Sequence, residues 1–521
     1  MYTSQASITV RERLCIEVKP APCGMVVFGA SGDLAHRKIL PSLLQLFAKK
    51  LLSEHFYVIG CGRTAYSDQA FKKIVREAIL AQAPDVTHDI ASAFLDRCYY
   101  ISGSYTDTSL YESLGRTMSE LDTKYSTEKN HLYYLSIPPM LYAPVVQHLA
   151  DAGQVQEHSS SNGWARVVVE KPHGHDLDSA KALSQQLRAV LSEDQIYRID
   201  HYLGKDTVQN IMMFRFANIM FEPVWNQQYI DHVQIAVTES LGIGSRAGYF
   251  EQAGLLRDMF QNHMMQLLSL VAMEPPHTFS ADHIRDEKMK LLRAVRPFPL
   301  DNLPAWIMRG QYSAGRIADR PVAGYREEQN VAGDSRTETF IAAKLMIDNW
   351  RWKGVPFYLR SGKRLKCKNS EIAVFFKHVP HSMFTPLNPE DLSPNVLIFT
   401  IQPDEGLVLR IQAKSPGPKL CISDMNLDVT YADVFKSAPP DAYERLLLDC
   451  MLGDQTLFVR DDIVELTWKL WTPVLNAWAG DPALPLYEYP AGSWGPAEAD
   501  QLVQSDNRQW RDLCLWCRGK E

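Results

Sequence analysis

Two consecutive domains of different fold class are predicted by the sequence: an α/β Rossmann-like dinucleotide-binding domain, followed by a larger α+β domain with a mostly antiparallel sheet. Strand-like and helix-like segments alternate from residue 25 to about residue 200, which is typical of a doubly wound parallel sheet. Beyond that point, a long amphipathic segment over 254–273 precedes successive strand-like runs without helices between them. The length of 521 residues suits two large domains. The predicted divisions are an N-terminal arm over 1–23, the nucleotide domain over 24–200 and the second domain over 201–521.

The first predicted strand, over 25–28, is wholly apolar, as expected for a parallel strand buried on both faces. It leads into Gly29, Gly32 and Ala35, which form a G-x-x-G-x-x-A pattern ahead of a helix-like stretch over 37–52. Small residues in such a loop let backbone N–H groups approach a pyrophosphate at the positive end of the helix. The pattern favours a dinucleotide site, although a simple tight turn accounts for the same spacing.

The second predicted strand, over 56–59, indicates which dinucleotide the loop suits. An Asp or Glu at the end of this strand would bind the hydroxyls of an unmodified ribose. The chain instead has glycines at 60 and 62 and then Arg63. A guanidinium at that rim matches a 2′-phosphate, which favours NADP over NAD. A solvated strand end is the alternative interpretation of Arg63.

The clearest later strands of this domain lie over 131–136 and 165–169, and the second of them ends at Glu170-Lys171-Pro172. In a doubly wound sheet the carboxyl ends of the strands face the ligand crevice, so Lys171 is placed to reach a cofactor or a substrate. The peptide bond before Pro172 is a candidate for the cis form, which about 5–6% of X-Pro bonds adopt.

A dense polar cluster, RIDHYLGK over 198–205, ends the first domain. His201, Tyr202 and Lys205 lie just ahead of a predicted helix N-terminus, and an imidazole, a hydroxyl and a cation at such a position suit a phosphate monoester. If the backbone is extended there, Asp200 and His201 point to opposite sides and have different roles. A salt-bridged surface turn is the competing interpretation.

The amphipathic segment over 254–273 carries His263, with Asp258 five residues earlier. In an α-helix five residues advance about 7.5 Å and turn about 140°, so one sugar lying across the helix could meet both groups although they do not share a stripe. A neutral imidazole beside a carboxylate is the usual general base near pH 7, whereas a lone histidine among methionines can simply belong to the core. A second basic run over 361–368 is either a solvated loop or part of the site.

Composition limits the classes of partner. The formal net charge is -7, and a nucleic-acid coat needs an excess of Lys and Arg, so we expect no nucleic acid, although a local basic cluster can bind a small anion. No run of about 18 uncharged apolar residues occurs, and the first residues lack the apolar core of a secretory signal, so we expect no membrane span and a cytoplasmic location. Nine cysteines, with Cys514 and Cys517 as one C-x-x-C, favour reduced thiols, and we expect no metal site.

Several sequence blocks together resemble the glucose-6-phosphate dehydrogenase family. They are GASGDLA at 29–35, EKPHG at 170–174, RIDHYLGK at 198–205, GVPFYLRSGKRL at 354–365, DAYERLLLD at 441–449 and GPAEAD at 495–500, with the helix that carries Asp258 and His263. The blocks occur in the order of the family and cover about residues 24–500. RIDHYLGK is the most specific of them.

The resemblance implies oxidation of glucose 6-phosphate at C1 to 6-phosphoglucono-1,5-lactone in the pentose phosphate pathway, with hydride transfer to NADP. It implies that His263 is the general base, oriented by Asp200, and that the chain forms a homodimer or homotetramer through its C-terminal sheet. The positions implied for substrate binding are Lys171, His201, Tyr202, Lys205, Glu239, Asp258, Lys363, Lys368 and Gln402. Those implied for cofactor binding are Gly29, Ala30, Ser31, Gly32, Asp33, Leu34, Arg63, Tyr142 and also Lys171.

The chain departs from the family where some members hold a second, structural NADP. Ala373, Thr400 and Trp494 stand where three arginines are expected. Because guanidinium–phosphate pairs supply much of the affinity for such a ligand, we predict a catalytic NADP and no structural one. His36 replaces the basic residue expected after Ala35, which would make phosphate contacts there weaker or dependent on pH.

Two other functions are open at this point. An oxidoreductase of the glucose–fructose oxidoreductase type also pairs a Rossmann domain with an open sheet and an E-K-P motif, and it would use Lys171 as the catalytic group. The phosphate cluster over 198–205 argues against it. A non-catalytic sensor of NADPH or sugar phosphates could keep the fold, but the intact pair of Asp200 and His263 argues against a loss of activity.

Overall fold

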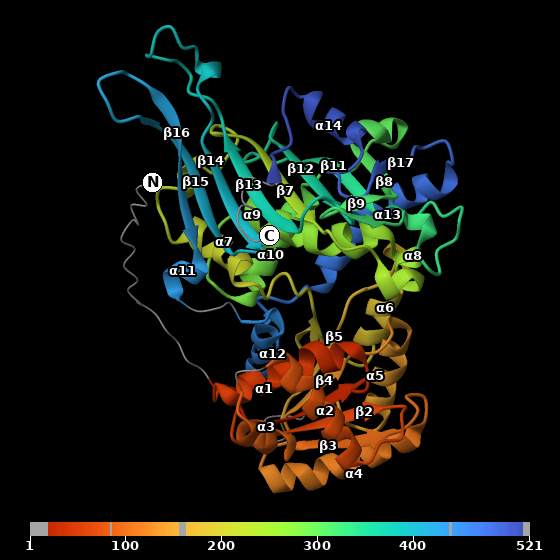
Figure 1. Cartoon of the computed structure of the whole chain (residues 1–521). Coiled ribbons are helices and arrows are strands. Elements are labelled where there is room, and N and C mark those ends of the chain that lie inside the picture. Colours follow the sequence, from red (N-terminus) through yellow and green to blue (C-terminus); the bar gives the residue numbers. More distant parts are fainter. Residues whose placement is uncertain (1–18, 84–85, 156–162, 437–439, 514–521) are drawn as a thin grey trace.

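The computed structural model describes residues 19–83, 86–155, 163–436 and 440–513, and Figure 1 shows two domains, each built on one large sheet. Most of the predicted N-terminal arm lies outside the described residues, as do Cys514 and Cys517. Within the described ranges, no helix combines the length and the hydropathy needed to cross a bilayer.

The N-terminal domain contains a six-stranded sheet. Its strands are β1 (Cys23–Phe28), β2 (Phe56–Gly62), β3 (Cys98–Ser102), β4 (His131–Leu135), β5 (Ala165–Val169) and β6 (Ile196–Arg198). The spatial order is β3-β2-β1-β4-β5-β6, and every neighbouring pair is parallel. The prediction of a doubly wound, Rossmann-like sheet is confirmed.

Helices cover both faces of this sheet. They are α1 (Leu40–Ala48), α2 (Asp68–Gln82), α3 (His88–Leu95), α4 (Thr108–Tyr125), α5 (Tyr142–Asp151) and α6 (Leu177–Arg188). Met25 and Val27 of β1 belong to an apolar cluster with α1, α2 and α3. Val26 and Phe28 belong to another with α4 and α5. Because successive side chains point to opposite faces, a strand covered on both sides has to be apolar throughout.

The helix predicted over 37–52 begins and ends about four residues earlier than expected, over 33–48. A π-helical turn, η1 (Ala35–Ile39), comes first, and α1 then runs only to Ala48. Pro41 lies inside this continuous helix, directly after the π-helical residues, where it cannot donate a bond to the turn before it. The π-helical segment ahead of Pro41 is therefore where the helix accommodates the proline.

The C-terminal domain contains a nine-stranded sheet. Its strands are β7 (Ile230–Thr238), β8 (Ile307–Ser313), β11 (Phe340–Met346), β12 (Pro356–Gly362), β13 (Asn369–Phe376), β14 (Val396–Gln402), β15 (Gly406–Lys414), β16 (Ile422–Thr430) and β17 (Tyr487–Pro490). The order is β16-β15-β14-β13-β7-β12-β11-β8-β17. The β7–β12 and β8–β17 pairs are parallel and the rest are antiparallel, which confirms a mostly antiparallel sheet. A short separate hairpin joins β9 (Gly315–Ile317) to β10 (Arg320–Val322).

The two faces of the nine-stranded sheet differ. The larger helices of this domain are α7 (Asp206–Phe216), α8 (Ala247–Leu255), α9 (Met265–Ala272), α10 (Ala281–Arg293), α12 (Ala442–Leu452) and α13 (Asp461–Gly480), with α11 (Tyr431–Phe435) and α14 (Asp500–Gln504) as shorter ones. Side chains of β7, β12 and β13 share the main apolar core with α7 and α9. A small separate cluster of Ala373, Val396, Ile398 and Val408 lies on the same sheet. One face of the sheet therefore carries the core of the domain.

The helix predicted over 254–273 is interrupted at its start. Gly254 adopts a φ of +63°, which separates α8 from the helix that follows. A Cβ at this position would lie 2.3 Å from Glu338 Oε1. That carboxylate accepts the N–H of Leu256, the first residue of the next helix, at 3.0 Å. The break needs glycine both for its backbone angle and for the space that Glu338 occupies.

The helix that carries His263 is not an α-helix. Residues Leu256–Met264 form a π-helical segment, η6, before α9 begins at Met265. In a π-helix each N–H bonds to the carbonyl five residues back, which brings Asp258 and His263 nearer to one face than α-helical geometry predicts. The expectation that these two residues do not share a stripe was therefore wrong.

Helix α12 ties the C-terminal part of the chain to the first domain, and it packs against α1 (Figure 1). Lys38 Nζ lies 2.6 Å from Asp441 at the start of this helix, and Lys49 Nζ lies 2.6 Å from Glu444. Arg166 of β5 donates to two backbone carbonyls near the end of α12, each at 2.8 Å. The helix thus closes one side of the space between the domains.

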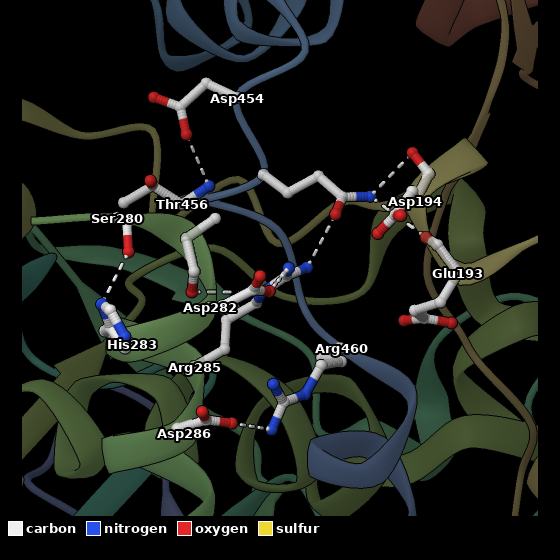
Figure 2. Close-up of polar contacts among 12 residues, drawn as sticks. Glu193, Asp194, Ser280, Asp282, His283, Arg285, Asp286, Asp454, Thr456 and Arg460 are labelled. Atoms are coloured by element: carbon white, nitrogen blue, oxygen red, sulfur yellow. Dashed lines mark hydrogen bonds and ion pairs between the residues drawn. The ribbon is translucent and has the colours of Figure 1, made fainter.

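A second polar junction holds the segment ahead of β6. Gln455 Nε2 donates to three backbone carbonyls over 193–196 at 3.1 to 3.2 Å, and its Oε1 accepts from Arg285 of α10 at 3.0 Å. Figure 2 shows Arg285 facing this segment, with Asp282 and Asp286 on the same helix. The junction fixes the start of β6 against α10, and Asp200 follows β6 directly.

Candidate active site

A cavity of about 1,100 Å³ lies between the two domains. Its lining includes all the predicted substrate-binding residues together with His263, Leu34 and Tyr142: Lys171, His201, Tyr202, Lys205, Glu239, Asp258, Lys363, Lys368 and Gln402. Asp200 lies behind His263 and does not line the cavity. The other predicted cofactor positions lie in the loop after β1 and at the end of β2.

The loop after β1 is a tight turn packed against the residue that follows β4. Gly29 has a φ of +83°, and a Cβ on it would lie 2.0 Å from the carbonyl oxygen of Ser136. Its N–H contacts Cys61 O and Tyr105 Oη, and the N–H of Gly32 returns to Gly29 O at 2.9 Å. Gly29 therefore shapes the turn, and the N–H groups that follow Gly32 are the ones directed along the start of η1.

Two further predicted cofactor positions border this loop. Arg63 follows the last residue of β2 and is exposed at the rim of the sheet. The Tyr142 hydroxyl donates to the backbone carbonyl of Glu170 at 2.9 Å, which joins the start of α5 to the end of β5. His36 is half-buried, and burial lowers the pKa of its imidazole. A neutral His36 adds no charge for a phosphate.

The carboxyl ends of β5 and β6 place Lys171 and Asp200 at one edge. These strands pair in parallel with Val169 opposite Arg198, and each functional residue follows its strand by two positions. The bond between Lys171 and Pro172 is cis, as the sequence suggested it could be. Parallel pairing thus brings together two residues that lie far apart in the chain.

His263 and Asp200 form a buried hydrogen-bonded pair. His263 Nδ1 lies 2.5 Å from Asp200 Oδ1, and the two side chains are 1% and 2% exposed. Asp200 Oδ1 also accepts the N–H of Tyr202 at 3.0 Å. Because Nδ1–H donates to the carboxylate, Nε2 is the ring nitrogen with a free lone pair. Burial would raise the pKa of Asp200, but the neighbouring imidazole outweighs it and holds that pKa at about 2.

Lys171 faces the lone pair of His263. Its Nζ lies 3.0 Å from His263 Nε2, 2.9 Å from Asp258 O and 3.1 Å from Asp258 Oδ1. Burial would lower the pKa of Lys171, but Asp258 outweighs it and raises that pKa, so the side chain is an ammonium. Burial lowers the pKa of His263. The site therefore holds a neutral base next to a fixed cation.

The second sheet contributes Glu239 and Lys363 from the carboxyl ends of β7 and β12. These two strands are parallel, with Thr238 opposite Gly362, so the residues that follow them meet at one edge. Lys363 Nζ lies 2.6 Å from Glu239 Oε2 and 3.8 Å from Asp258 Oδ2. Two carboxylates and a buried ammonium form an arrangement that can bind several sugar hydroxyls.

The far end of the cavity is basic. Lys205 Nζ donates to Gln402 Oε1 at 2.8 Å and lies 5.0 Å from the centre of the Tyr202 ring. Gln402 Nε2 donates to Ser370 Oγ at 2.7 Å, which leaves its carbonyl toward Lys205. Lys368 lines the same region. An anion such as a phosphate has charge-assisted donors here.

The N-terminus of α7 is not free to bind that anion. Glu405 accepts both the N–H of Thr207, at 3.1 Å, and the Thr207 hydroxyl. At least one N–H of the helix end that was expected to help hold a phosphate is therefore already bonded to a carboxylate of the chain. The basic side chains remain as the receptor.

Sequence reasoning missed several residues of the cavity. Lys38, Glu170, Tyr249 and Tyr443 line it. Glu170 Oε1 accepts the Tyr134 hydroxyl at 2.6 Å and the Tyr443 hydroxyl at 3.0 Å, and burial raises its pKa. Lys38 lies just after the block at 29–35, and Tyr443 lies inside the block at 441–449. This proximity to a motif block was the only feature of the sequence that could have indicated them.

Asp200, His201 and His263 have ligand atoms within 4.8 Å of one another. Their arrangement does not suit a cation. His263 Nδ1 is committed to Asp200, and the ammonium of Lys171 stands against Nε2. A positive charge at that place would repel a metal ion. The grouping is better understood as the hydrogen-bonded pair already described.

Comparison with known families and proteins agrees with this geometry. The family models "Glucose-6-phosphate dehydrogenase, NAD binding domain" and "Glucose-6-phosphate dehydrogenase, C-terminal domain" match residues 26–210 and 212–511. The glucose-6-phosphate 1-dehydrogenase of Chlamydia pneumoniae is 45% identical over 496 residues, covering 94% of this chain and 96% of that protein. That of Bacillus subtilis is 43% identical over 490 residues, covering 94% and 98%.

Solved structures give the same match. A glucose-6-phosphate dehydrogenase in complex with its substrate glucose-6-phosphate superposes with a TM-score of 0.86 and 35% identity, covering 95% of this chain and 100% of that one. The glucose-6-phosphate 1-dehydrogenase of Mycobacterium avium gives a TM-score of 0.80 and 37% identity, covering 95% and 99%.

Proposed function

The chain belongs to the glucose-6-phosphate dehydrogenase family, and on that premise we propose that it oxidises glucose 6-phosphate at C1 to 6-phosphoglucono-1,5-lactone, with hydride transfer to NADP. It is an oxidoreductase of glucose and pentose phosphate metabolism. The observation that carries the proposed mechanism is the His263–Asp200 pair, because the imidazole is turned toward a cavity with basic groups at its far end.

His263 is the general base. The C1 hydroxyl gives its proton to Nε2, the electrons of the O–H bond form the second bond of the C1 carbonyl, and the hydrogen on C1 leaves with the electron pair of the C1–H bond as hydride. The imidazolium that results keeps Nδ1–H on Asp200 at 2.5 Å, so an ionised carboxylate stabilises the new charge. Asp200 is buried and ionised before the reaction, so it needs no reorganisation during the step.

Lys171 contacts the base first and is also within reach of the substrate. In the ligand-free site its ammonium donates to His263 Nε2, and the C1 hydroxyl has to take that place. The cation beside the ring disfavours imidazolium, which keeps His263 neutral until a proton arrives. Asp258 holds the ammonium within reach of both the base and the sugar. A permanently protonated lysine is a poor general base, which argues against a mechanism of the glucose–fructose oxidoreductase type.

The two ends of the sugar meet different groups. Glu239, Asp258 and Lys363 bind hydroxyls, and their mutual contacts at 2.6 and 3.8 Å show how closely they converge. The 6-phosphate is held by the basic end of the cavity: His201, Tyr202, Lys205, Lys368 and Gln402. Burial lowers the pKa of His201, so that imidazole acts as a neutral hydrogen-bond partner and the lysines supply the charge.

The loop after β1 suits the cofactor. NADP, when bound, accepts the hydride at its nicotinamide ring. The tight turn that Gly29 permits and the backbone around Gly32 fit a close approach by a pyrophosphate, with Ala30, Ser31, Asp33 and Leu34 completing the loop. Arg63 at the exposed rim matches a 2′-phosphate. Tyr142 and Lys171 border the cavity where the nicotinamide would reach the sugar.

The described residues of the C-terminal sheet support the absence of a structural NADP. Ala373 is fully buried in the cluster with Val396, Ile398 and Val408. The nearby arginines are engaged within the chain, because Arg511 pairs with Glu371 at 2.5 Å and Arg360 donates to Arg511 O at 2.7 Å. Trp494 lies over Arg360. One NADP per chain is the stoichiometry that these contacts support.

The outer strand of the C-terminal sheet suits contact with a second copy of the chain. Met425 and Leu427 of β16 are 40% and 46% exposed. Apolar side chains on an unpaired outer strand are ordinarily covered by another chain, which supports a homodimer or homotetramer through this sheet.

A direct assay tests the proposed reaction. Growth of the NADPH absorbance band is followed with glucose 6-phosphate and NADP, and compared with free glucose and with NAD. The phosphorylated sugar with NADP should be the preferred pair. His263→Asn should lower kcat by about 10²–10⁴-fold because the base is lost. If the wild-type chain does not turn over the substrate, a non-catalytic sensor is the remaining function. If His263→Asn keeps the wild-type rate, His263 is not the general base and the proposed mechanism is wrong.

A further inference from the structure

A second, much smaller cavity lies behind Asp200. Its volume is about 10 Å³, and the polar residues around it are Asp200, His173, Gln261, Asn262, Gln266 and Thr467. Lys171 is the one residue that lines both this cavity and the substrate cavity. A polar space of this size is about what a single water molecule needs.

Two buried acceptor atoms at this cavity have no hydrogen-bond partner among the described residues: Asp200 Oδ2 and His173 Nε2. The side chain of Asp200 is 2% exposed, and His173 is 8% exposed. Both described contacts of the Asp200 carboxylate, with His263 Nδ1 and with the N–H of Tyr202, use Oδ1. Leaving the other oxygen of an ionised carboxylate without a donor costs a substantial desolvation penalty.

His173 is an acceptor on this side. Burial lowers the pKa of its imidazole to about 3, with Arg198 adding to the effect, so the ring is neutral. The ring also bonds to the backbone of Ile199, and because Nε2 has no partner that contact uses Nδ1. A neutral imidazole that donates through Nδ1 accepts through Nε2. Two acceptors that face one space cannot bond to each other, but a water molecule can donate to both.

The third wall of the cavity supplies a donor. Gln266 Oε1 accepts from Lys288 Nζ at 3.3 Å, so the NH₂ group of this amide is the part that can donate into the cavity. Lys288 is 1% exposed and belongs to α10. Arg285, one turn earlier on that helix, is fixed by Asp282 and by Gln455, as Figure 2 shows for the Asp282 contact. The orientation of Gln266 is therefore set by an anchored helix.

We propose that one water molecule occupies this cavity, donating to Asp200 Oδ2 and to His173 Nε2 and accepting from Gln266, and that His173 and Gln266 are thereby positioning residues for the Asp200–His263 pair. The inference deepens the proposed function and rests on it. The water completes the hydrogen bonds of the carboxylate, so that Asp200 stays ionised and keeps one orientation when His263 takes the proton.

The effect on proton affinity has a definite sign. A hydrogen bond to an ionised carboxylate stabilises the charged form, so losing one makes the Asp200–His263 pair hold a proton more tightly. The other charged or titratable groups around the pair are Lys171 after β5, Arg198 on β6, His201, Tyr202, Asp258 on η6, Lys288 on α10 and Tyr443 on α12. They are unchanged in the variants below.

The first test is the pH profile of kcat/KM with glucose 6-phosphate and NADP. In His173→Phe, the acid limb should move to higher pH by about 0.5–1 unit, a three- to tenfold gain in proton affinity. His173→Gln offers the water an acceptor again and should return the limb toward the wild-type position. His232→Phe is the matched control, because that buried histidine lies at the opposite end of β7 from Glu239. It should leave the limb in place.

Gln266→Leu carries the same test if His173→Phe does not fold, and it should move the limb in the same direction. A purely structural role for these residues would lower the melting temperature or kcat without moving the limb. An acid limb that is the same in the wild type, His173→Phe and Gln266→Leu, or that moves equally in His173→Phe and His173→Gln, would overturn the proposal.

The second test needs no activity. A crystal structure of the full chain, at a resolution that shows ordered water, should contain density within hydrogen-bond distance of both Asp200 Oδ2 and His173 Nε2. The proposal is contradicted if the cavity contains no water density, or if the density lies within hydrogen-bond distance of only one of the two atoms. If the wild-type chain does not turn over glucose 6-phosphate, the proposed function fails while this test still decides whether the water is present.

Discussion

The candidate site takes residues from two parallel strand pairs, one in each sheet, and the two pairs arise differently. In the N-terminal domain every pair is parallel, and Lys171 and Asp200 follow β5 and β6. In the C-terminal domain the sheet is mostly antiparallel, yet Glu239 and Lys363 follow the parallel strands β7 and β12. Parallel pairing places the residues after two strands at one edge, whereas antiparallel pairing places them at opposite edges. A single parallel pair is therefore enough to build a sugar site on an antiparallel sheet.

The two edges have different tasks. In the proposed mechanism the edge of β5 and β6 holds the groups that handle the proton, because Asp200 binds His263 and Lys171 contacts Nε2 of that ring. The edge of β7 and β12, where Lys363 pairs with Glu239, is proposed to bind sugar hydroxyls without taking the proton. Variants at the first edge should change kcat, and variants at the second should change KM.

The largest effect is expected at the end of β6. Asp200→Asn should lower kcat by about 10²–10⁴-fold, because an amide supports the wrong tautomer of His263 and does not stabilise its imidazolium. KM for glucose 6-phosphate should change little. Steady-state kinetics check this, with Asp348→Asn as a control, since that exposed carboxylate pairs with Arg296 away from the cavity. If Asp200→Asn keeps a nearly normal kcat, the edge of β5 and β6 does not hold the groups that handle the proton, and the comparison of the two edges fails.

The next effect concerns the phosphate receptor that follows β6. Lys205→Ala should raise KM for glucose 6-phosphate by about 10- to 100-fold, since it removes a charge-assisted donor, and should leave kcat close to its original value. Lys49→Ala is the control, because Lys49 pairs with Glu444 outside the cavity. An unchanged KM in Lys205→Ala contradicts the phosphate assignment.

At the end of β12 a smaller effect is expected. Lys363→Met should raise KM about tenfold, because Glu239 loses its cation and the sugar loses a donor. Lys344→Met provides a matched control on the neighbouring strand β11, where Lys344 pairs with Asp506 at 2.5 Å. If Lys363→Met instead lowers kcat and leaves KM alone, the second edge takes part in the chemistry and the comparison fails.

The smallest effect is expected at the rim of the first sheet. Arg63→Ala should reduce the ratio of kcat/KM for NADP to that for NAD by about tenfold or less, because an exposed guanidinium is screened by solvent. Arg76→Ala on α2, also exposed, is the control. Measurements with both cofactors at one ionic strength check it. If the NADP-to-NAD ratio of kcat/KM does not change in Arg63→Ala, Arg63 is a solvated strand end and does not bind the 2′-phosphate.

Much of the fold was predictable because strands of a parallel sheet are apolar throughout. The prediction for β5 matches the structure residue for residue, and β4 differs by one residue. The C-terminal strands were predicted from local alternation, but their pairing was not, because the parallel contact of β7 with β12 depends on all of the chain between them. Local pattern thus identifies strands, and long-range pairing places their ends.

The site residues that belong to a sequence motif were predictable, whereas contacts between segments far apart in the chain were not. The contact of Asp200 with His263 was implied by the family resemblance, and the structure places the two side chains within hydrogen-bond distance. The π-helical geometry of η6 was missed, since its apolar spacing is close to that of an α-helix. The contact of Glu405 with α7 was missed because it joins residues almost 200 positions apart. No local pattern reports such a pair.

Glu405 at the start of α7 has a consequence for competition between ligands. A helix end with free N–H groups attracts any anion, including inorganic phosphate. Here a carboxylate of the chain occupies that end and sets a negative charge near Lys205. The attraction left for a bare anion is weakened, and tight binding requires the additional hydroxyl contacts that only a sugar can make. We therefore expect inorganic phosphate in the surrounding solution to be a poor inhibitor, which would leave the pocket available to a phosphorylated sugar.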